Sequence, residues 1–342
     1  MSGINGLVSF NRSNETLNRE LIYLMNNKIN YRGPNGNFVY ADDYCGFGMV
    51  SLSILDNNDR NKEIYNLKHN KVIVFDGHIY NHLEIKKELV SRGYVFNSET
   101  VTEVVLTSFE EFGSKCLDLF NGMFAFSIYD IKRNEIFIGR DRVGKKPLYY
   151  YKDNSNFIFS SELKSIISTN YIDKKINFDS LANYFRFYYI PEPNTIFKNV
   201  YKLPAAHFMR VKVKSKEIYM EKYWDISKAD YIEDLSIAKT ELRSTLTKAV
   251  ERRMENNMPI GAFLSGGIDS SIMVGLMTEV SSRPIHTFTL GYKDNKLYDE
   301  SNLARKVAAH NSTIHHEEFI NHKDIQEVIE KLLKQIDEPF AD

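Results

Sequence analysis

The chain has few cysteines, almost no net charge and no long hydrophobic run. Cys45 and Cys116 are its two cysteines, and they lie far apart in the sequence, so we expect no disulfide framework. The formal net charge of −1 gives no sign of a nucleic-acid partner or an anionic membrane surface. No apolar run reaches the roughly 18 residues of a membrane span, and the N-terminus lacks a signal-peptide pattern. The sequence therefore predicts a cytoplasmic protein that binds neither nucleic acid nor membrane.

The length and composition favour two domains with substantial cores. The 342 residues include 43% hydrophobic residues, with 22 Phe and 21 Tyr. In the first part, short apolar runs and turn signals predict strands, and 3.6-residue spacing predicts helices. We expect strands at 2–10, 72–75, 123–130, 135–140, 147–151 and 157–160, and helices after Asn14 and at 82–91 and 101–112. This pattern predicts an α+β domain that ends at Trp224.

The second part has a different pattern, in which strands and helices alternate. After a linker at 225–236, we expect helices at 237–253, 270–280, 300–310 and 325–336, and strands at 260–264, 286–291 and 313–319. Alternation of this kind indicates a parallel sheet with helices on both faces. A ligand would then bind at the carboxyl ends of the strands.

One loop lies at such a strand end and carries the strongest functional signal. The run Phe263–Ser271 reads Phe-Leu-Ser-Gly-Gly-Ile-Asp-Ser-Ser, which is an apolar strand end, a glycine turn and a helix start. Glycines let backbone N–H groups approach a phosphate, and the helix dipole favours its charge. Asp269 could hold Mg²⁺, a cation that prefers oxygen ligands. The loop is not a P-loop, because no Gly-Lys-Ser/Thr follows. An ordinary tight turn is the alternative interpretation.

Several further strings occur in order along the chain, and together with this loop they define a resemblance. They are Arg32-Gly33-Pro34, Leu52-Ser53-Ile54, Gly77 with Ile79-Tyr80-Asn81, Gly122–Phe126, Arg140-Asp141-Arg142, Lys146–Tyr150, Ser161-Glu162, Asp299-Glu300-Ser301 and Asp337–Asp342. The chain resembles glutamine-dependent asparagine synthetase and its amidotransferase relatives from residue 1 to residue 342. The resemblance implies an α+β, Ntn-hydrolase-like amidotransferase domain at 2–224 and part of an α/β, parallel-sheet ATP-pyrophosphatase domain at 237–342.

The resemblance also implies a two-site mechanism. In this family an N-terminal Cys hydrolyses glutamine, and ammonia passes through a tunnel to a carboxylate, usually aspartate, that ATP has activated as an acyl-adenylate. The positions that match the ATP site are Leu264, Ser265, Gly266, Gly267, Asp269 and Ser270, together with Leu290, which packs on the adenine. The cofactors implied are ATP and Mg²⁺, with Asp269 as the metal ligand.

The glutaminase site departs from the family at each position that matters. Ser2 stands where the family has its nucleophilic Cys, and Ser51 stands where it has the arginine that binds the glutamine carboxylate. Asp76, beside Gly77, replaces the asparagine of the oxyanion hole, and Val101 replaces the aspartate that binds the amino group of glutamine. A hydroxyl is a weaker nucleophile than a thiolate, and a carboxylate repels an oxyanion. We therefore expect a degenerate glutaminase site. An active site with a shifted alignment is the alternative.

The family continues beyond the position of Asp342, with a second Ser-Gly-Glu-Gly loop, acids for magnesium and a lysine. We therefore expect a truncated synthetase domain, which is either a fragment or is completed by a second chain. The expected function is ATP-dependent amide formation on a small carboxylate. Two alternatives stay open. One is a relative that uses free ammonia or an amine in secondary-metabolite or glycan biosynthesis. The other is a non-catalytic binding subunit. A homodimer is also compatible with the sequence.

Overall fold

The computed structural model describes the chain except for residues 1, 53–64, 67–69, 228–230, 255–258 and 342. The side chains of 65 and 66 are likewise left undescribed. The chain divides into two compact units. Unit 1 comprises Met1–Ile226 together with Ile336–Asp342, and unit 2 comprises Ser227–Gln335.

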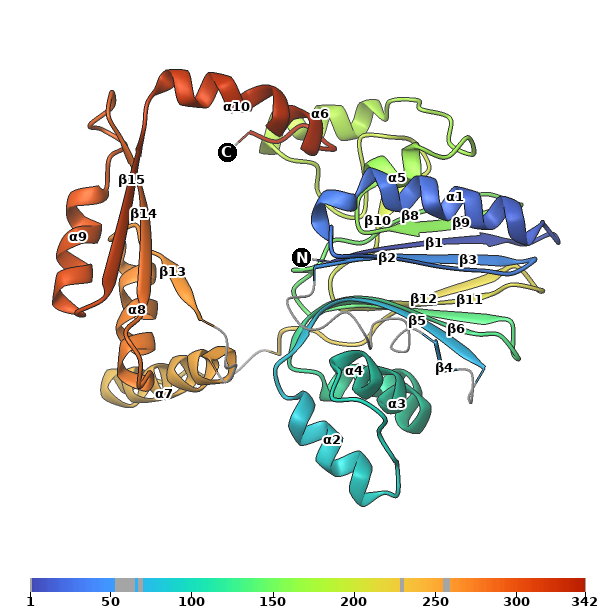
Figure 1. Ribbon diagram of the computed structural model, residues 1–342, viewed down its shortest axis with the longest axis horizontal. Coiled ribbons are helices and arrows are strands. Elements are labelled where there is room, and N and C mark those ends of the chain that lie inside the picture. Colours follow the sequence, from blue (N-terminus) through green and yellow to red (C-terminus); the bar gives the residue numbers. More distant parts are fainter. Residues whose placement is uncertain (1, 53–64, 67–69, 228–230, 255–258, 342) are drawn as a thin grey trace. The chain divides into compact units, whose positions relative to one another are not determined.

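Unit 1 contains two six-stranded sheets, and all of their strand pairs are antiparallel (Figure 1). The first sheet has the order β10 (Val200–Lys202), β8 (Tyr149–Lys152), β9 (Asn156–Ser160), β1 (Gly3–Ser9), β3 (Cys45–Ser51) and β2 (Gly36–Ala41). The second has the order β12 (Glu217–Lys222), β11 (His207–Lys212), β7 (Glu135–Arg140), β6 (Gly122–Asp130), β5 (Lys71–Ile79) and β4 (Tyr65–Asn66).

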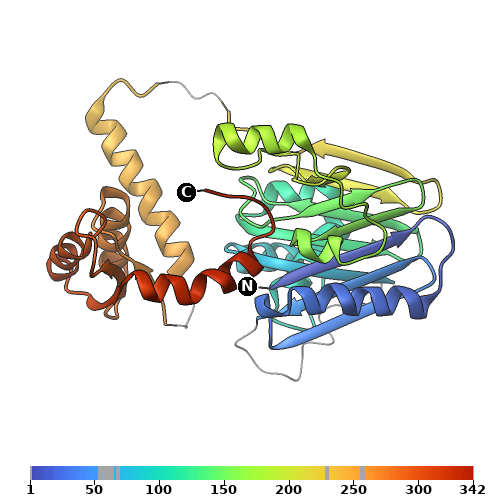
Figure 2. The ribbon, with the colours of Figure 1, turned by 90° about the horizontal axis from the view of Figure 1, so that it is seen from above.

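Helices cover the outer faces of both sheets. The first sheet packs against α1 (Glu15–Lys28) and α5 (Leu163–Ile167), and the second against α2 (His82–Ser91), α3 (Val101–Phe112) and α4 (Cys116–Leu119). The short 3-10 helices η1 (Asn30–Arg32) and η3 (Gly113–Lys115) follow α1 and α3, and α6 (Phe178–Phe187) lies later in the chain. The result is a four-layer α–β–β–α sandwich, whose layers lie one above another in Figure 1 and are seen from the side of α1 in Figure 2.

The sequence of β6 explains why it lies in the middle of this sandwich. Phe124, Phe126 and Ile128 pack in the cluster beneath α3, whereas the alternate residues Ala125 and Tyr129 pack in the cluster between the sheets. Successive side chains of a strand point to opposite faces, so a strand buried on both faces must be apolar almost throughout. Tyr129 also stacks on a ring of the other sheet, that of Phe47, with centroids 5.8 Å apart.

Unit 2 contains a parallel sheet of three described strands, in the order β13 (Gly261–Phe263), β14 (His286–Tyr292) and β15 (Ile314–Ile320). Its helices are α7 (Leu235–Met254), α8 (Ile268–Val280), α9 (Ser301–His310) and α10 (His322–Gln335). Two small clusters of buried residues hold these elements together. Among the helices described in either unit, none is both long and apolar enough to cross a membrane.

The predicted fold class is confirmed in both parts: an α+β sandwich precedes a parallel α/β sheet. The last residues differ from the expected arrangement. Helix α10 ends at Gln335 rather than continuing to 336, and Ile336–Asp342 pack with unit 1. Contacts of two adjacent residues with unit 1 account for this: Asp337 accepts a hydrogen bond from the backbone N–H of Lys164, and Glu338 forms an ion pair with Lys202.

Candidate functional site

The position of the family nucleophile lies at the start of β1, next to a buried arginine. Ser2 immediately precedes the strand, and its carbonyl oxygen accepts a hydrogen bond of 2.9 Å from Nε of Arg32. Arg32 ends the 3-10 helix that follows α1, and its side chain is 8% exposed. The backbone of Ser2 is thereby tied to a charged side chain that also contacts the second sheet.

Asp76 lies in β5 of that second sheet, and two cations neutralise it. Its Oδ2 is 3.1 Å from Nη2 of Arg32, and its Oδ1 is 2.9 Å from Nζ of Lys146. The exposed fractions of the three side chains are 1%, 8% and 6%. Paired, hydrogen-bonded charges are the form in which a protein interior tolerates carboxylates and cations. The sequence motifs contained Arg32 and Lys146, but nothing in them indicated that both would converge on Asp76.

Asp141 holds the loop that presents Lys146. Its buried carboxylate accepts hydrogen bonds from the backbone N–H groups of four residues at 2.9–3.2 Å, namely Phe124, Val143, Lys145 and Lys146. A carboxylate that satisfies four donors fixes a turn because each of those N–H groups would otherwise need another partner. The Arg-Asp-Arg string therefore serves as a scaffold for the lysine beside Asp76.

The ion network extends from Arg32 toward the end of the chain. Nη1 of Arg32 is 2.9 Å from Oε1 of Glu162, and the other oxygen, Oε2, accepts a hydrogen bond from the Tyr31 hydroxyl. Lys164 lies 3.1 Å from Glu162 and 3.4 Å from Asp337. Burial acts to lower the pKa of Arg32, but the charges of Asp76 and Glu162 outweigh it and raise that pKa. Burial raises the pKa of Asp337, and Lys164 opposes that shift.

The other predicted pocket positions are distributed around this network. Ser51 ends β3, and its backbone is so close to Gly33 that a side chain at that glycine would collide with it. Gly77 follows Asp76 in β5, where an added Cβ would collide with the carbonyl oxygen of Met123. Ser51 and Asp76 are therefore both placed beside the Arg32-Gly33 segment. Val101 instead begins α3 and packs against the cluster beneath that helix.

The predicted anion loop lies between β13 and α8 in unit 2. Ser265 Oγ accepts a hydrogen bond of 3.2 Å from the N–H of Gly267 and lies 3.0 Å from Ser270 Oγ. Gly266 has φ +83°, and a Cβ there would lie 2.6 Å from the backbone nitrogen of Ala304 in α9. Only glycine fits this backbone without strain. The loop thus brings a tight glycine turn to the N-terminus of a 13-residue helix.

The remaining predicted positions of this loop differ in exposure. Leu264 is buried among Val274, Ala304 and Ala308, so only its backbone is available to a ligand. Asp269 is exposed in the first turn of α8, and Leu290 is 50% exposed in β14. Among the described residues, no three His, Cys, Asp or Glu side chains are grouped as metal ligands. Asp269 fits a cation that a single carboxylate shares with phosphate oxygens, as Mg²⁺ commonly does.

Comparison with known proteins assigns this chain to a family. A model described as a glutamine amidotransferase domain matches residues 1–224, and a model described as asparagine synthase matches residues 241–342. A putative glutamine-hydrolysing asparagine synthetase of Methanocaldococcus jannaschii is 38% identical over 368 residues, which cover 100% of this chain and 69% of the relative. This chain belongs to the asparagine synthetase family. Asparagine synthetase 3 of Bacillus subtilis is 30% identical over 359 residues, which cover 99% of the chain and 57% of that relative.

The chain spans about half to two thirds of the length of the asparagine synthetases that it matches. Asparagine synthetase 1 of Bacillus subtilis, for example, is covered over 50% of its length. Among solved structures, the allosteric regulatory enzyme of purine biosynthesis matches with a TM-score of 0.48 and 11% identity, over 93% of this chain and 80% of the other. The predicted membership of the family, made from the motif strings, is thus confirmed.

Proposed function

We propose that this chain is part of an ATP-dependent amide-forming ligase whose amidotransferase domain no longer hydrolyses glutamine. The observation that carries the second half of this proposal is the pairing of Asp76 with Arg32 and Lys146 at 3.1 Å and 2.9 Å. A glutaminase needs a hydrogen-bond donor aimed at the developing oxyanion. An ionised carboxylate is an acceptor only.

The positions around Asp76 support the same conclusion. Ser2 has a hydroxyl in place of a thiol, and Ser51 offers no cation for the carboxylate of glutamine. Arg32, whose Nε contacts Ser2, already engages Asp76 and Glu162, and Lys146 engages Asp76 as well. Val101 cannot accept a hydrogen bond from an amino group. We infer that the amidotransferase domain has been kept as a structural partner.

The synthetase half of the proposal rests on the loop between β13 and α8. The backbone N–H groups at the start of α8 would bind the pyrophosphate portion of ATP, because a helix N-terminus offers unpaired donors and positive potential. Asp269 would hold Mg²⁺ together with the phosphate oxygens, and the ion would neutralise their charge. Leu290 would pack against the adenine.

The proposed reaction has two balanced steps. A carboxylate oxygen of the acceptor, aspartate in the first instance, attacks the α-phosphorus of ATP, and pyrophosphate leaves with the electrons of the broken P–O bond. The nitrogen of ammonia then attacks the carbonyl carbon of the acyl-adenylate, AMP leaves, and the nitrogen loses a proton. The loop of Ser265 and Gly266 would serve the first step by binding the leaving pyrophosphate.

The glutaminase half is tested by glutamate release from glutamine, measured with the purified chain. We expect no turnover above a Ser2→Ala variant, and we expect Ser2→Cys to stay inactive because Asp76 is unchanged. Turnover by the native chain that Ser2→Ala abolishes would contradict the proposal.

The ligase half is tested by exchange of labelled pyrophosphate into ATP in the presence of aspartate and other small carboxylates. The protein should be assayed in its native cell extract as well as in purified form, because the known relatives are longer. Exchange that depends on one carboxylate supports the proposal. Binding of ATP without exchange in either preparation would favour a non-catalytic binding subunit.

The departures at Ser2, Ser51, Asp76 and Val101 also suit a second candidate, which differs in the substrate that it amidates. An enzyme of this kind would use free ammonia, or an amine of its own substrate, in secondary-metabolite or glycan biosynthesis. Exchange of pyrophosphate that depends on a carboxylate other than aspartate would favour this candidate over the first. We further propose a cytoplasmic location, in keeping with two buried free thiols, and assembly with a second chain or a second copy.

A further inference from the structure

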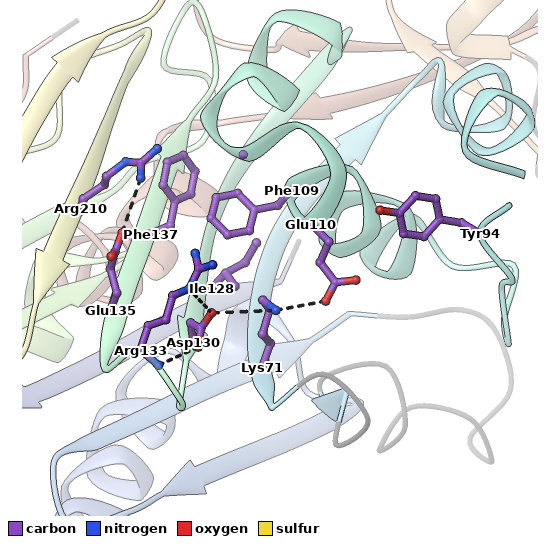
Figure 3. Close-up of a pocket in the computed structure, with 11 residues that line it drawn as sticks. Lys71, Tyr94, Phe109, Glu110, Ile128, Asp130, Arg133, Glu135, Phe137 and Arg210 are labelled. Atoms are coloured by element: carbon purple, nitrogen blue, oxygen red, sulfur yellow. Dashed lines mark hydrogen bonds and ion pairs between the residues drawn. The ribbon is translucent and has the colours of Figure 1, made fainter. Parts of the chain in front are cut away.

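A separate pocket lies on the outer face of the second sheet, and the proposed function does not use it. The cavity has a volume of about 370 Å³ and lies where α3 ends over strands β5, β6, β7 and β11 (Figure 3). It is lined by Lys71, Tyr94, Phe109, Glu110, Gly113, Ile128, Asp130, Arg133, Glu135, Phe137 and Arg210. A cavity of this size suits a small molecule.

The strand register explains the layout of the pocket. Phe137 pairs across the sheet with Ile128 on one side and with Arg210 on the other, which gives an apolar row with a cation at its end. Two positions along the strands from Ile128 and Phe137, Asp130 pairs with Glu135 and with Lys71, which gives a row of charged side chains. Side chains at i and i+2 share a face, so the two rows form one continuous surface.

Helix α3 covers only part of the apolar row. The ring of Phe109 lies over Phe137 with their centroids 4.6 Å apart, and the helix ends three residues later at Phe112. Gly113 then has φ +59°, a left-handed conformation in which helices commonly end. Phe137 itself is buried, whereas Phe109 and Tyr94 are partly exposed and form the aromatic wall of the pocket, on either side of Glu110 in Figure 3.

Three ion pairs on the rim are long, whereas a fourth, between Lys71 Nζ and Glu110, is 3.2 Å. Nζ of Lys71 is 3.9 Å from Asp130, Nε of Arg133 is 3.8 Å from the same carboxylate, and Nη1 of Arg210 is 3.6 Å from Glu135. The buried Lys146–Asp76 pair is 2.9 Å by comparison. Arg133 is 79% exposed, so its guanidinium is free to turn toward a ligand. Loose, partly exposed pairs can exchange partners at small cost.

We propose that this pocket binds a free α-amino acid with a large apolar side chain. The lining carries three cations and three carboxylates, which suits a zwitterion better than a ligand of one sign. The α-carboxylate would pair with Arg133 and Arg210, and the α-ammonium with Glu135. The side chain would lie against the rings of Phe109 and Tyr94. This site is separate from the residues of the proposed ligase activity.

The test is calorimetric titration of the full chain with L-phenylalanine and L-leucine. We expect saturable binding with one site per chain. Two analogues test the two charged groups of the ligand separately, since 3-phenylpropionate lacks the ammonium group and phenethylamine lacks the carboxylate. Each should bind about tenfold more weakly or worse, which is the loss expected for one charge-assisted pair. L-Aspartate, which has no apolar side chain, should bind more weakly as well.

Two variants locate the site. Arg133→Gln and Glu135→Gln should each weaken binding of L-phenylalanine about tenfold, whereas Arg12→Gln should leave it unchanged. Arg12 is a matched control because it is 74% exposed and pairs with a surface aspartate, Asp43. The proposal is overturned if neither amino acid binds saturably, if the analogues bind as tightly as L-phenylalanine, or if both pocket variants bind like the native chain.

Discussion

Asp76 is the residue on which the buried charge network of unit 1 converges. Its carboxylate is 1% exposed and is engaged on both oxygens, by Arg32 and by Lys146. Charges removed from water in this way are tolerated only while they stay paired. The native fold of unit 1 therefore depends on Asp76.

Replacing Asp76 with Asn should destabilise unit 1 by about 3 kcal/mol, because Lys146 would keep its charge in a buried position without a charged partner. Urea denaturation measures this change. The matched control is Asp225→Asn, which breaks an exposed pair with Lys222 and should leave the free energy of unfolding nearly unchanged. Equal effects of the two substitutions would contradict the assigned role of the network.

Gly266 offers a second prediction at this scale. Gly266→Ala should destabilise unit 2 by roughly 1–3 kcal/mol, because φ is +83° and the new Cβ would lie 2.6 Å from the nitrogen of Ala304. Gly267→Ala is the control, since the nearest atom to its Cβ would be Ser265 Oγ at 3.3 Å. Hydrogen exchange of amides in α8 and α9 reports the change. A larger effect at Gly267 would show that the loop has another geometry.

At the scale of elements, the sequence predicted long periodic helices better than glycine-rich strands. Helix 82–91 and helix 101–112 are found as α2 and α3 with the predicted bounds. Strands β2 and β3 were not predicted, and β3 contains Gly46 and Gly48. A Cβ at either glycine would collide with Ile22 of α1, so these residues are glycine because a helix packs closely on the strand. The contact with α1 forms only in the folded protein. Local β-strand propensity, which disfavours glycine, therefore argues against a strand at these residues.

The terminal segment Ile336–Asp342 allows a prediction from two adjacent carboxylates. Burial raises the pKa of Asp337 above its usual range, so the folded state binds its proton more tightly than the unfolded state. The stability this provides is present at low pH and is lost as pH rises through the raised pKa. Asp337→Asn should therefore tighten docking of the segment at neutral pH and remove this pH dependence, while keeping an acceptor for the backbone N–H of Lys164.

Glu338→Gln should have the opposite effect. Glu338 accepts from Lys202 Nζ and from the backbone nitrogen of Ile196, each at 2.8 Å, and the substitution removes its charge. The amide of Ala341, which donates to the carbonyl oxygen of Tyr188, reports docking by its hydrogen exchange. Its exchange should slow in Asp337→Asn and speed up in Glu338→Gln, with the exposed Glu330→Gln as control. Changes of the same sign in both variants would refute this account.

At the scale of the whole molecule, the family could be predicted because the motif strings occur in one order, whereas the buried network could not. Arg32 and Lys146 lie 44 and 70 positions from Asp76, and a single sequence does not reveal such pairs. The pocket beneath the end of α3 was missed for the same reason, since its charges come from strands that pair only in the fold. Side-chain chemistry that one segment supplies is predictable, and chemistry assembled from several segments needs the structure.

The two units differ strongly in core size, and this predicts two unfolding steps. Unit 1 is held by three clusters that include ten or more buried residues each, whereas the two clusters of unit 2 contain four each, and α10 contains no buried residue. Buried apolar area is the main source of stability, so unit 2 should unfold at a lower urea concentration than unit 1. Hydrogen exchange measured across a urea series separates the two steps by their peptides.

The variants described above make this prediction specific. Gly266→Ala should move only the first step, because its strain lies within unit 2, and Asp76→Asn should move only the second, because its network lies within unit 1. Independent cores give additive, separable changes of this kind. If one cooperative transition responds equally to both substitutions, the chain folds as a single unit, and the amidotransferase part then stabilises the synthetase part directly. Two separate responses would mean that the small core of unit 2 sets the lower limit of stability for the loop between β13 and α8.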